Sequence, residues 1–447
     1  MTAYSKDNFQ GVIAVDSEGF VVWYANVTTV VSRDDRKLIS SPHIVGFDQF
    51  ADGSVCLADA GTNMLLKVGV DGETQAFHEF PARPALRHQQ GPYSNATYHE
   101  CRVTPEQKVL AVGQHSMAVP TFTVMSDGKV ETCDGVLDEV VYEWDPTSDA
   151  VKALFHVSDY VPWQQLLPYF RDTSTSGIVL ERADNGYVTM YHTSSVSVSS
   201  DGKLYIVSLR DINTVLAIDR STLERAWMVS STLATNSTFA LSETTKFYQV
   251  HDALLYSKLG PGGEDVLTLM DDGNEREGCD TGDISESVPT LCASRGLGLT
   301  LPTRVGAHAQ TQLEYSTPST WGSKDFETND VFNYDGGSMV LINGTGARAQ
   351  WLCSFTDTDK TGFTSSSYIF QLDASGDVRG EMLLPRVTWP DNTESGSYRV
   401  NPLITIGGER SKGLSAAFDL PADADDADDA PATGAEGDDD NARRRQR

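Results

Sequence analysis

The sequence predicts an all-β protein, a six-bladed β-propeller with long inter-strand loops, from three observations. Runs of β-branched and aromatic residues of strand length recur along most of the chain. Turns that contain Asp-Gly or a related pair separate these runs, and such turns join antiparallel neighbours. The resulting unit recurs between two incomplete terminal pieces, which indicates a propeller whose chain ends together complete one blade.

The clearest unit spans residues 196–229. It contains the strand-like runs VSV, KLYIVS, TVLAID and RAWMV. The SSDGK turn after the first run offers a glycine, which readily takes the positive φ that a tight hairpin needs. This segment therefore predicts one complete four-stranded blade.

Weaker units surround this segment, with central turns near residues 52, 106, 262 and 335. The opening GVIAVDSEGFVVWY matches only the outer half of a unit, and residues 158–170 favour a short helix within a loop. The alternative is another antiparallel fold, such as a pair of β-sandwiches. Because large all-β folds often run as one domain, we expect a single propeller domain over residues 1–418.

The last segment, residues 419–447, predicts a disordered acidic tail that ends in a basic cluster. It is low in complexity and almost free of large apolar side chains, so it buries too little surface to offset the entropy of ordering. Ten acidic residues and four arginines give this tail a net charge of −6.

The whole chain is strongly acidic, with 63 Asp and Glu against 34 Lys and Arg and a formal net charge of −29. Such a surface repels nucleic acid and anionic lipid, which are therefore not expected as partners. No stretch approaches the ~18 apolar residues of a membrane helix. The first residues lack the apolar segment of a signal peptide, so they do not identify the compartment.

None of the six cysteines forms a C-x-x-C pair, which argues against a zinc knuckle or a thioredoxin-like motif. Cys279 and Cys292 flank a polar insert. They could close it as a disulfide, or they could remain unpaired small hydrophobic residues.

Three histidines occupy equivalent places in successive units. His99, His192 and His251 each precede or enter the first strand of their unit. The first strand of a propeller blade lines the central channel, so these imidazoles should converge at one mouth. Arg210 follows the next strand of its unit and should join them.

Such a cluster allows several interpretations. It could bind a tetrahedral anion, use one neutral imidazole as a nucleophile, or hold a metal through three histidines. The alternative is that each histidine only satisfies a local backbone hydrogen bond.

The ordered motifs of the chain resemble those of the aryl-sulfate sulfotransferases. That family has H-x-N-S-V, S-S-R-x-x-N-T-V, Q-H-D and D-N-G-N segments in the central blades. The matching segments, which extend over residues 95 to 400, are YHE around His99, HTSSV from His192, SLRDINTV from Ser208, QVHDA from Gln249, DDGN from Asp271, SRGL from Ser294 and SYRVN from Ser397.

The resemblance implies transfer of a sulfuryl group from a phenolic sulfate ester to a phenolic acceptor, without phosphoadenosine phosphosulfate or another cofactor. It assigns the nucleophile to His251, which would carry a sulfohistidine in a ping-pong reaction. Arg210, His192 and His99 would stabilise the sulfuryl oxygens or move the phenolic proton. The resemblance also favours an exported compartment, and it leaves a homo-oligomer open.

Three positions depart from the family pattern. Ser194, the expected substrate-binding hydroxyl, replaces an Asn, Val250 is inserted before His251, and Gly296 replaces an Ala. The first two changes bear on the site, so a propeller that only binds a sulfated or other anionic ligand remains an alternative. A hydrolase or lyase that reuses the site, with or without a metal, is another. Asp252 could orient His251 or cap a turn, and the DDGN segment predicts a tight turn.

Overall fold

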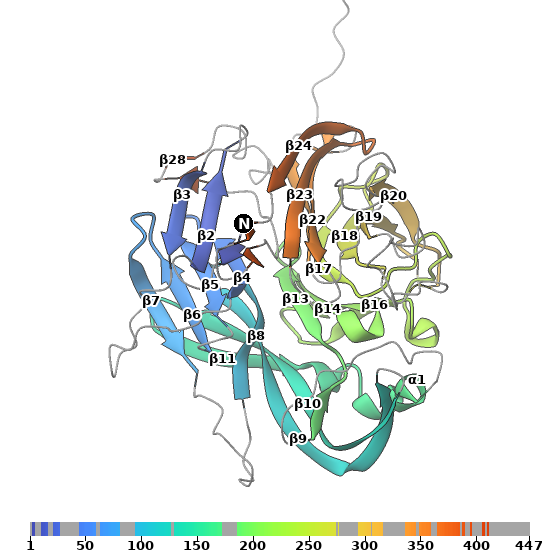
Figure 1. The fold of residues 1–447 in the computed structure, drawn as a ribbon. Helices are drawn as coiled ribbons and strands as arrows, with labels where there is room; N and C mark the ends of the chain where they lie inside the picture. The colour runs from blue at the N-terminus through green and yellow to red at the C-terminus, as the bar shows by residue number, and fades with distance from the viewer. Residues whose placement is uncertain are drawn as a thin grey trace, which may run out of the picture.

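The computed structural model describes most of the chain between residues 2 and 410 and shows an all-β propeller (Figure 1). The described residues are 2–4, 10–16, 21–26, 44–59, 63–80, 94–126, 129–171, 186–273, 276, 294–304, 306–315, 336–345, 348–358, 364–384, 387–388, 394–395, 405–406 and 409–410.

Five antiparallel blades follow one another in chain order, each with four consecutive strands. Blade 1 contains β4 (Ile44–Gln49), β5 (Val55–Asp59), β6 (Met64–Val68) and β7 (Thr74–Glu79). Blade 2 contains β8 (Ser94–Val103), β9 (Val109–Ser126), β10 (Lys129–Asp145) and β11 (Ala150–His156). Blade 3 contains β13 (Thr193–Val198), β14 (Leu204–Leu209), β15 (Thr214–Asp219) and β16 (Arg225–Ser230). Blade 4 contains β17 (His251–Tyr256), β18 (Asp265–Asp271), β19 (Arg295–Leu301) and β20 (Gln310–Tyr315). Blade 5 contains β21 (Ser338–Asn343), β22 (Gln350–Thr358), β23 (Thr364–Asp373) and β24 (Val378–Leu384).

The prediction of six blades is wrong, because the structure shows five. The first strands instead form a separate three-stranded sheet of β1 (Thr2–Tyr4), β2 (Gln10–Val15) and β3 (Val21–Asn26). Its side chains pack on blade 1 through Val12 and Ala25 and on blade 5 through Ile13 and Val15.

The predicted blade shared by both chain ends is not formed by the described strands. The last four, β25 (Val387–Thr388), β26 (Glu394–Ser395), β27 (Thr405–Ile406) and β28 (Glu409–Arg410), pair only as two hairpins. Each contains two residues, and so short a strand offers too few backbone hydrogen bonds to complete a blade.

Blade 3 forms as its sequence predicts. Residues 196–198 pair with 205–207, and the intervening turn places Gly202 at φ +74°, where a residue with a Cβ is strained. The Ser199 hydroxyl donates to Asp201 and accepts from the backbone N–H of Leu204, so the turn satisfies its own polar groups.

Apolar side chains fill the spaces between successive blades. Leu209 and Leu216 of blade 3 pack with Val112 of blade 2 in one cluster, and equivalent clusters join blades 3 with 4 and 4 with 5. Gly296 lies at the last of these contacts, where an added Cβ would meet Cys353 Sγ at 2.6 Å. Close packing against blade 5 thus accounts for glycine where the family has alanine.

The loop after β11 contains the short helices that its sequence favours: the 3-10 helices Val157–Asp159 and Trp163–Gln165 and α1 (Leu167–Phe170). Two further 3-10 turns are Arg210–Ile212 and Ala234–Asn236. Trp163 and Phe170 pack on Phe122 of the long β9–β10 hairpin. The same hairpin pairs in parallel with β12 (Tyr187–Thr189), which leads directly to His192.

A disulfide joins Cys56 of blade 1 to Cys101 of blade 2, a pairing that the sequence does not indicate. Cys133 and Cys353 are buried free thiols, whereas Cys279, Cys292 and the predicted tail lie outside the described residues. Within the described part of the chain, no helix is long and apolar enough to cross a membrane.

Candidate active site

The candidate site is built on the innermost strands of blades 2, 3 and 4, which are β8, β13 and β17. His99 lies within β8, His192 immediately precedes β13, and His251 is the first residue of β17. The backbone N–H of Arg210 donates to the carbonyl of His192 at 3.0 Å, so these two residues lie opposite each other across the β13–β14 pair. Exposed fractions are small: 8% for His99, 6% for His192 and Arg210, and 0% for His251.

His99 and His192 contact each other directly. Their Nε2 atoms are 3.2 Å apart, and the ring centroids are 5.1 Å apart. A hydrogen bond between two imidazole nitrogens needs one protonated and one unprotonated nitrogen. The pair therefore holds one proton between two blades.

His251 has a different environment, in which a carboxylate fixes its ring. Its Nδ1 lies 2.8 Å from Asp272 Oδ2 and 3.1 Å from the carbonyl oxygen of Gln249. The Gln249 carbonyl accepts a hydrogen bond from Nδ1 and the Asp272 carboxylate favours a proton on the same nitrogen, so the neutral ring keeps its lone pair on Nε2. A neutral imidazole in this tautomer can act as a nucleophile through Nε2.

Arg210 is fixed beside the imidazole pair by Asp211. Its Nη1 donates to Asp211 Oδ1 at 3.1 Å, and the same oxygen lies 3.9 Å from His192 Nδ1. Asp211 is fully buried. The Asp211 carboxylate thus partly balances the charge of the Arg210 guanidinium and also lies on the Nδ1 side of the His192 ring.

Several residues at the site have backbone angles that side chains rarely adopt. His192, Gln249 and Asp252 have φ values of +47°, +52° and +46°. Backbone strain of this kind persists only where the surroundings enforce it, and it is frequent at functional sites.

Side chains from neighbouring blades hold this strained backbone. Glu139 Oε2 of β10 accepts the N–H of Thr193 at 2.6 Å, and Asn213 Oδ1 accepts the N–H of Gln249 at 2.6 Å. The backbone on either side of the site histidines is therefore fixed from blades 2 and 3.

Ser194 links the segment that follows His192 to the segment that precedes His251. Its buried hydroxyl donates to the carbonyl of Val250 at 2.7 Å, immediately before His251. The residue that replaces the family asparagine thus contacts the residue that is inserted before His251. A direct contact of Ser194 with substrate stays a prediction.

The DDGN segment does more than turn the chain. Asp272 contacts His251, while Asp271 accepts from Arg295 Nε and Arg276 Nη2, both at 2.7 Å, and from the N–H of Tyr248 at 2.9 Å. This network holds the segment before His251 against the end of β18. Burial raises the pKa of the Tyr248 phenol there.

Sequence reasoning missed Asp272, Asp211 and Arg102 as site neighbours. A signal for Asp272 existed, because antiparallel pairing of β17 with β18 places the DDGN turn beside the start of β17. Asp252, which the sequence suggested for orienting His251, instead lies 2.5 Å from Arg102 Nη2.

The other described histidines lie in separate environments. His78 contacts Asp149, and His308 forms an isolated bridge with Ala240. His156 contacts Asp138 and its ring lies near that of His115, whose pKa is lowered by burial and by His156.

His43 and His88 lie outside the described residues. Among the residues that the structure describes, no group of three or more His, Cys, Asp or Glu side chains is arranged to hold a metal ion.

The fold and the site define a β-propeller with a buried imidazole and guanidinium cluster between its inner strands. A family model for arylsulfotransferase (ASST) matches residues 33–281, more than half of the chain and the part that contains every candidate site residue. The chain belongs to the arylsulfotransferase family, which suggests a sulfotransferase acting on small phenolic substrates. The comparison with curated proteins gives no match.

Solved structures resemble the chain only distantly. A protein of unknown function from Bacteroides caccae is 9% identical, with 85% of this chain and 92% of that chain covered and a TM-score of 0.38. Hydrazine synthase of Kuenenia stuttgartiensis is 10% identical, with 80% and 68% covered and a TM-score of 0.35. The Cps50 (Swd1) β-propeller domain of Myceliophteria thermophila is 10% identical, with 83% and 79% covered and a TM-score of 0.37.

Proposed function

We propose that this protein transfers a sulfuryl group from a phenolic sulfate ester to a phenolic acceptor in two steps, through a sulfohistidine on His251. The observation that carries the proposal is the contact of His251 Nδ1 with Asp272, in a fully buried ring. It favours the tautomer in which Nε2 carries the lone pair that attacks sulfur.

In the first step the Nε2 lone pair forms a bond to sulfur, and the bond from sulfur to the phenolic oxygen breaks. The His99–His192 pair, in its singly charged imidazolium–imidazole form, donates the proton between its Nε2 atoms to the departing oxygen and is left as two neutral imidazoles. In the second step the acceptor phenol returns a proton to this pair as its oxygen attacks sulfur. The N–S bond then breaks, and its electron pair returns to Nε2.

Arg210 would stabilise the sulfuryl oxygens as negative charge moves during each step. A guanidinium offers several hydrogen-bond donors in a planar fork, and Asp211 holds this one in place. Burial of the site strengthens such interactions, because little water competes for the donors. It also favours an acceptor phenol over water in the second step.

The decisive experiment is mass spectrometry of the protein quenched after reaction with a chromogenic aryl sulfate and no acceptor. We expect one sulfuryl group on His251, and a His251→Asn variant that keeps its fold but releases no phenol. An adduct on another residue, or wild-type release of phenol by the variant, would contradict the assignment.

The same assay separates the alternatives. Phenol release that continues in water without an adduct, and that stops with a chelator, supports a metal-dependent hydrolase. Binding of the aryl sulfate without release of phenol supports a propeller that only binds its ligand.

A further inference from the structure

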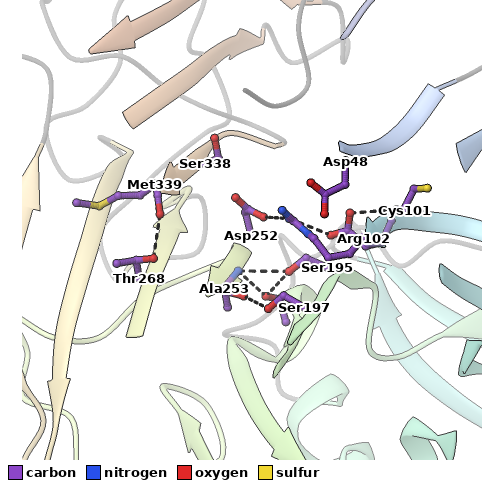
Figure 2. Close-up of polar contacts among 12 residues, drawn as sticks. Asp48, Cys101, Arg102, Ser195, Ser197, Asp252, Ala253, Thr268, Ser338 and Met339 are labelled. Carbon is purple, nitrogen blue, oxygen red and sulfur yellow. Dashed lines mark hydrogen bonds and ion pairs between the residues drawn. The ribbon is translucent and has the colours of Figure 1, made fainter. Parts of the chain in front are cut away.

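A buried ion pair that includes Asp252, the residue after His251 in the chain, joins strands of two blades that are not neighbours. Arg102 belongs to β8 of blade 2 and Asp252 to β17 of blade 4, with β13 of blade 3 between them in chain order. Arg102 Nη2 and Asp252 Oδ1 are 2.5 Å apart, and the side chains are 10% and 0% exposed. Figure 2 shows the guanidinium extending toward Asp252, with the Asp48 carboxylate near its other side.

More than one carboxylate surrounds this arginine. Glu100 Oε2 lies 3.5 Å from the same Nη2 atom. Burial by itself would lower the pKa of Arg102, but Glu100, Asp252 and Asp48 together hold it above its ordinary value. Burial in turn raises the pKa of Asp48, against the influence of Arg102. Arg102 therefore stays charged and is the cation at the centre of an acidic cluster.

This cluster matters because Asp252 directly follows His251 in the chain. A nucleophilic imidazole must be uncharged, and a nearby carboxylate favours the protonated form. Asp272 already contacts Nδ1 of His251. A second, uncompensated carboxylate at residue 252 would therefore increase the fraction of imidazolium, which cannot attack sulfur.

We infer that Arg102 is a positioning residue that keeps His251 uncharged and nucleophilic by neutralising Asp252. The inference rests on the proposed function, in which His251 attacks sulfur. Arg102 acts through Asp252 and needs no contact with substrate. In the same contact it fixes residue 252, whose backbone has φ +46°, against the strand that bears His99.

The other charged groups around His251 are balanced by partners of their own. Asp211 contacts Arg210, and Asp271 contacts both Arg276 and Arg295. The titratable and charged groups on the elements around His251 include Asp48, His99, Glu100, Arg102, Glu139, His192, Arg210, Asp211, Tyr248, Asp252, Tyr256, Asp271, Asp272, Arg276 and Arg295. Replacing Arg102 changes the balance of charge chiefly at Asp252, Glu100 and Asp48.

The test is the pH dependence of phenol release in a single turnover without acceptor. In Arg102→Met, Asp252 loses its positive partner, so His251 holds its proton to higher pH. We expect the acidic limb of the profile to move upward by about one pH unit. In Asp252→Asn, Arg102 stays while one carboxylate is removed, so the limb should move downward. The double variant should return toward the wild-type midpoint.

Arg220→Met is the matched control. Arg220 is also a largely buried arginine in an ion pair, with Glu106 at 2.7 Å, and its other described side-chain contacts are with Gly202 and Tyr205 and not with the site histidines. The pH profile of Arg220→Met should keep the wild-type midpoint of its acidic limb. If Arg102→Met fails to fold, as a thermal melt would reveal, the downward movement in Asp252→Asn still tests the inference.

Acidic limbs that stay at the wild-type midpoint, or that move in the same direction in both single variants, overturn the inference. The two hypotheses fail differently. A wild-type protein that forms no adduct on His251 contradicts the proposed function, whereas a normal adduct with unmoved profiles contradicts only the role of Arg102.

Discussion

The two imidazole environments of the site are built differently. His251 contacts a carboxylate, Asp272, at the end of a strand in its own blade. His99 and His192 contact each other across the boundary between blades 2 and 3. A carboxylate fixes the proton on one known nitrogen, whereas two imidazoles can pass a proton between them. In the proposed function, the first environment suits nucleophilic attack and the second suits proton transfer.

The two environments also depend on different parts of the fold. The ring of His251 contacts Asp272, which directly follows β18, and Arg295 of β19 holds the end of β18 through Asp271. The imidazole pair depends instead on how two blades pack. Substitutions within blade 4 should therefore slow the attack of His251 on sulfur. Substitutions at the contacts between blades 1 and 2 or between blades 2 and 3 should slow the proton transfer to the leaving oxygen.

The largest effect is expected from Asp272→Asn. The carboxamide can no longer fix the proton on Nδ1 of His251, so a large part of the protein holds the wrong tautomer. We expect phenol release in a single turnover to slow by about 10³–10⁴-fold, the size seen when a histidine loses its orienting carboxylate. Stopped-flow absorbance with a chromogenic aryl sulfate measures this rate.

Asp265→Asn is the control for that variant. Asp265 begins the same strand, β18, but accepts only a backbone N–H of Lys258 among the contacts described for it. Its rate should stay within about twofold of wild type, because a surface substitution of this kind changes little. Equal losses in both variants would show that the effect comes from the strand and not from the contact with His251.

The second effect is expected from His192→Gln, which interrupts proton sharing with His99. Loss of a general acid typically costs about 10²–10⁴-fold, and it matters most when the leaving oxygen is basic. We therefore expect a loss of about 10²-fold with an unactivated phenyl sulfate and a much smaller loss with a nitrophenyl sulfate. Comparing the two donors in single turnovers measures this dependence on the leaving group.

His78→Gln serves as the control, because His78 lies on β7, the outer strand of blade 1, and contacts Asp149 in the β10–β11 turn of blade 2. It should leave both donors unaffected. If His192→Gln slows the two donors equally, the imidazole pair stabilises the sulfuryl oxygens instead of moving a proton.

A third effect concerns the boundary between blades 1 and 2. Replacing Cys56 and Cys101 by alanine removes a disulfide that closes a long chain segment, and we expect the free energy of unfolding to fall by about 2–4 kcal/mol. Cys101 lies two residues after His99, so the donor with the more basic leaving group should also slow. Denaturant titration and the two-donor assay measure both consequences.

Cys133→Ala, which removes a buried free thiol, is the comparison for stability. It should cost less, because no covalent link is lost. A disulfide variant as stable as Cys133→Ala would remove the proposed role of this link in holding the two blades.

The sequence predicts where individual blades lie better than it predicts how many blades there are. Alternating apolar runs and glycine turns are local signals, so blade 3 appears where residues 196–229 place it. The closing of the ring depends on pairing between strands at opposite ends of the chain, which no local pattern encodes. The terminal strands after residue 386 are two residues long, and they form hairpins instead of a sixth blade.

The same distinction applies to the site. Equivalent positions in successive units predict that the histidines converge, and the structure brings His99 and His192 together. The sequence suggested Asp252 but not its partner Arg102, because these two residues meet across 150 residues of chain. Asp272 was read only as a turn residue, since a turn motif does not indicate which strand start it faces.

The smallest effect compares two serines of β13 that make the same kind of hydrogen bond. Ser194 donates to the carbonyl of Val250 at 2.7 Å, and Ser197 donates to that of Ala253 at 2.9 Å, on either side of His251 in the chain. Replacing either by alanine should lower the free energy of unfolding by about 1 kcal/mol. Only Ser194→Ala should also slow phenol release, by about threefold to tenfold, because it frees the backbone that enters the nucleophile. Equal rates in the two variants would show that Ser194 supports the fold alone, and that the inserted Val250 needs no such contact to place His251.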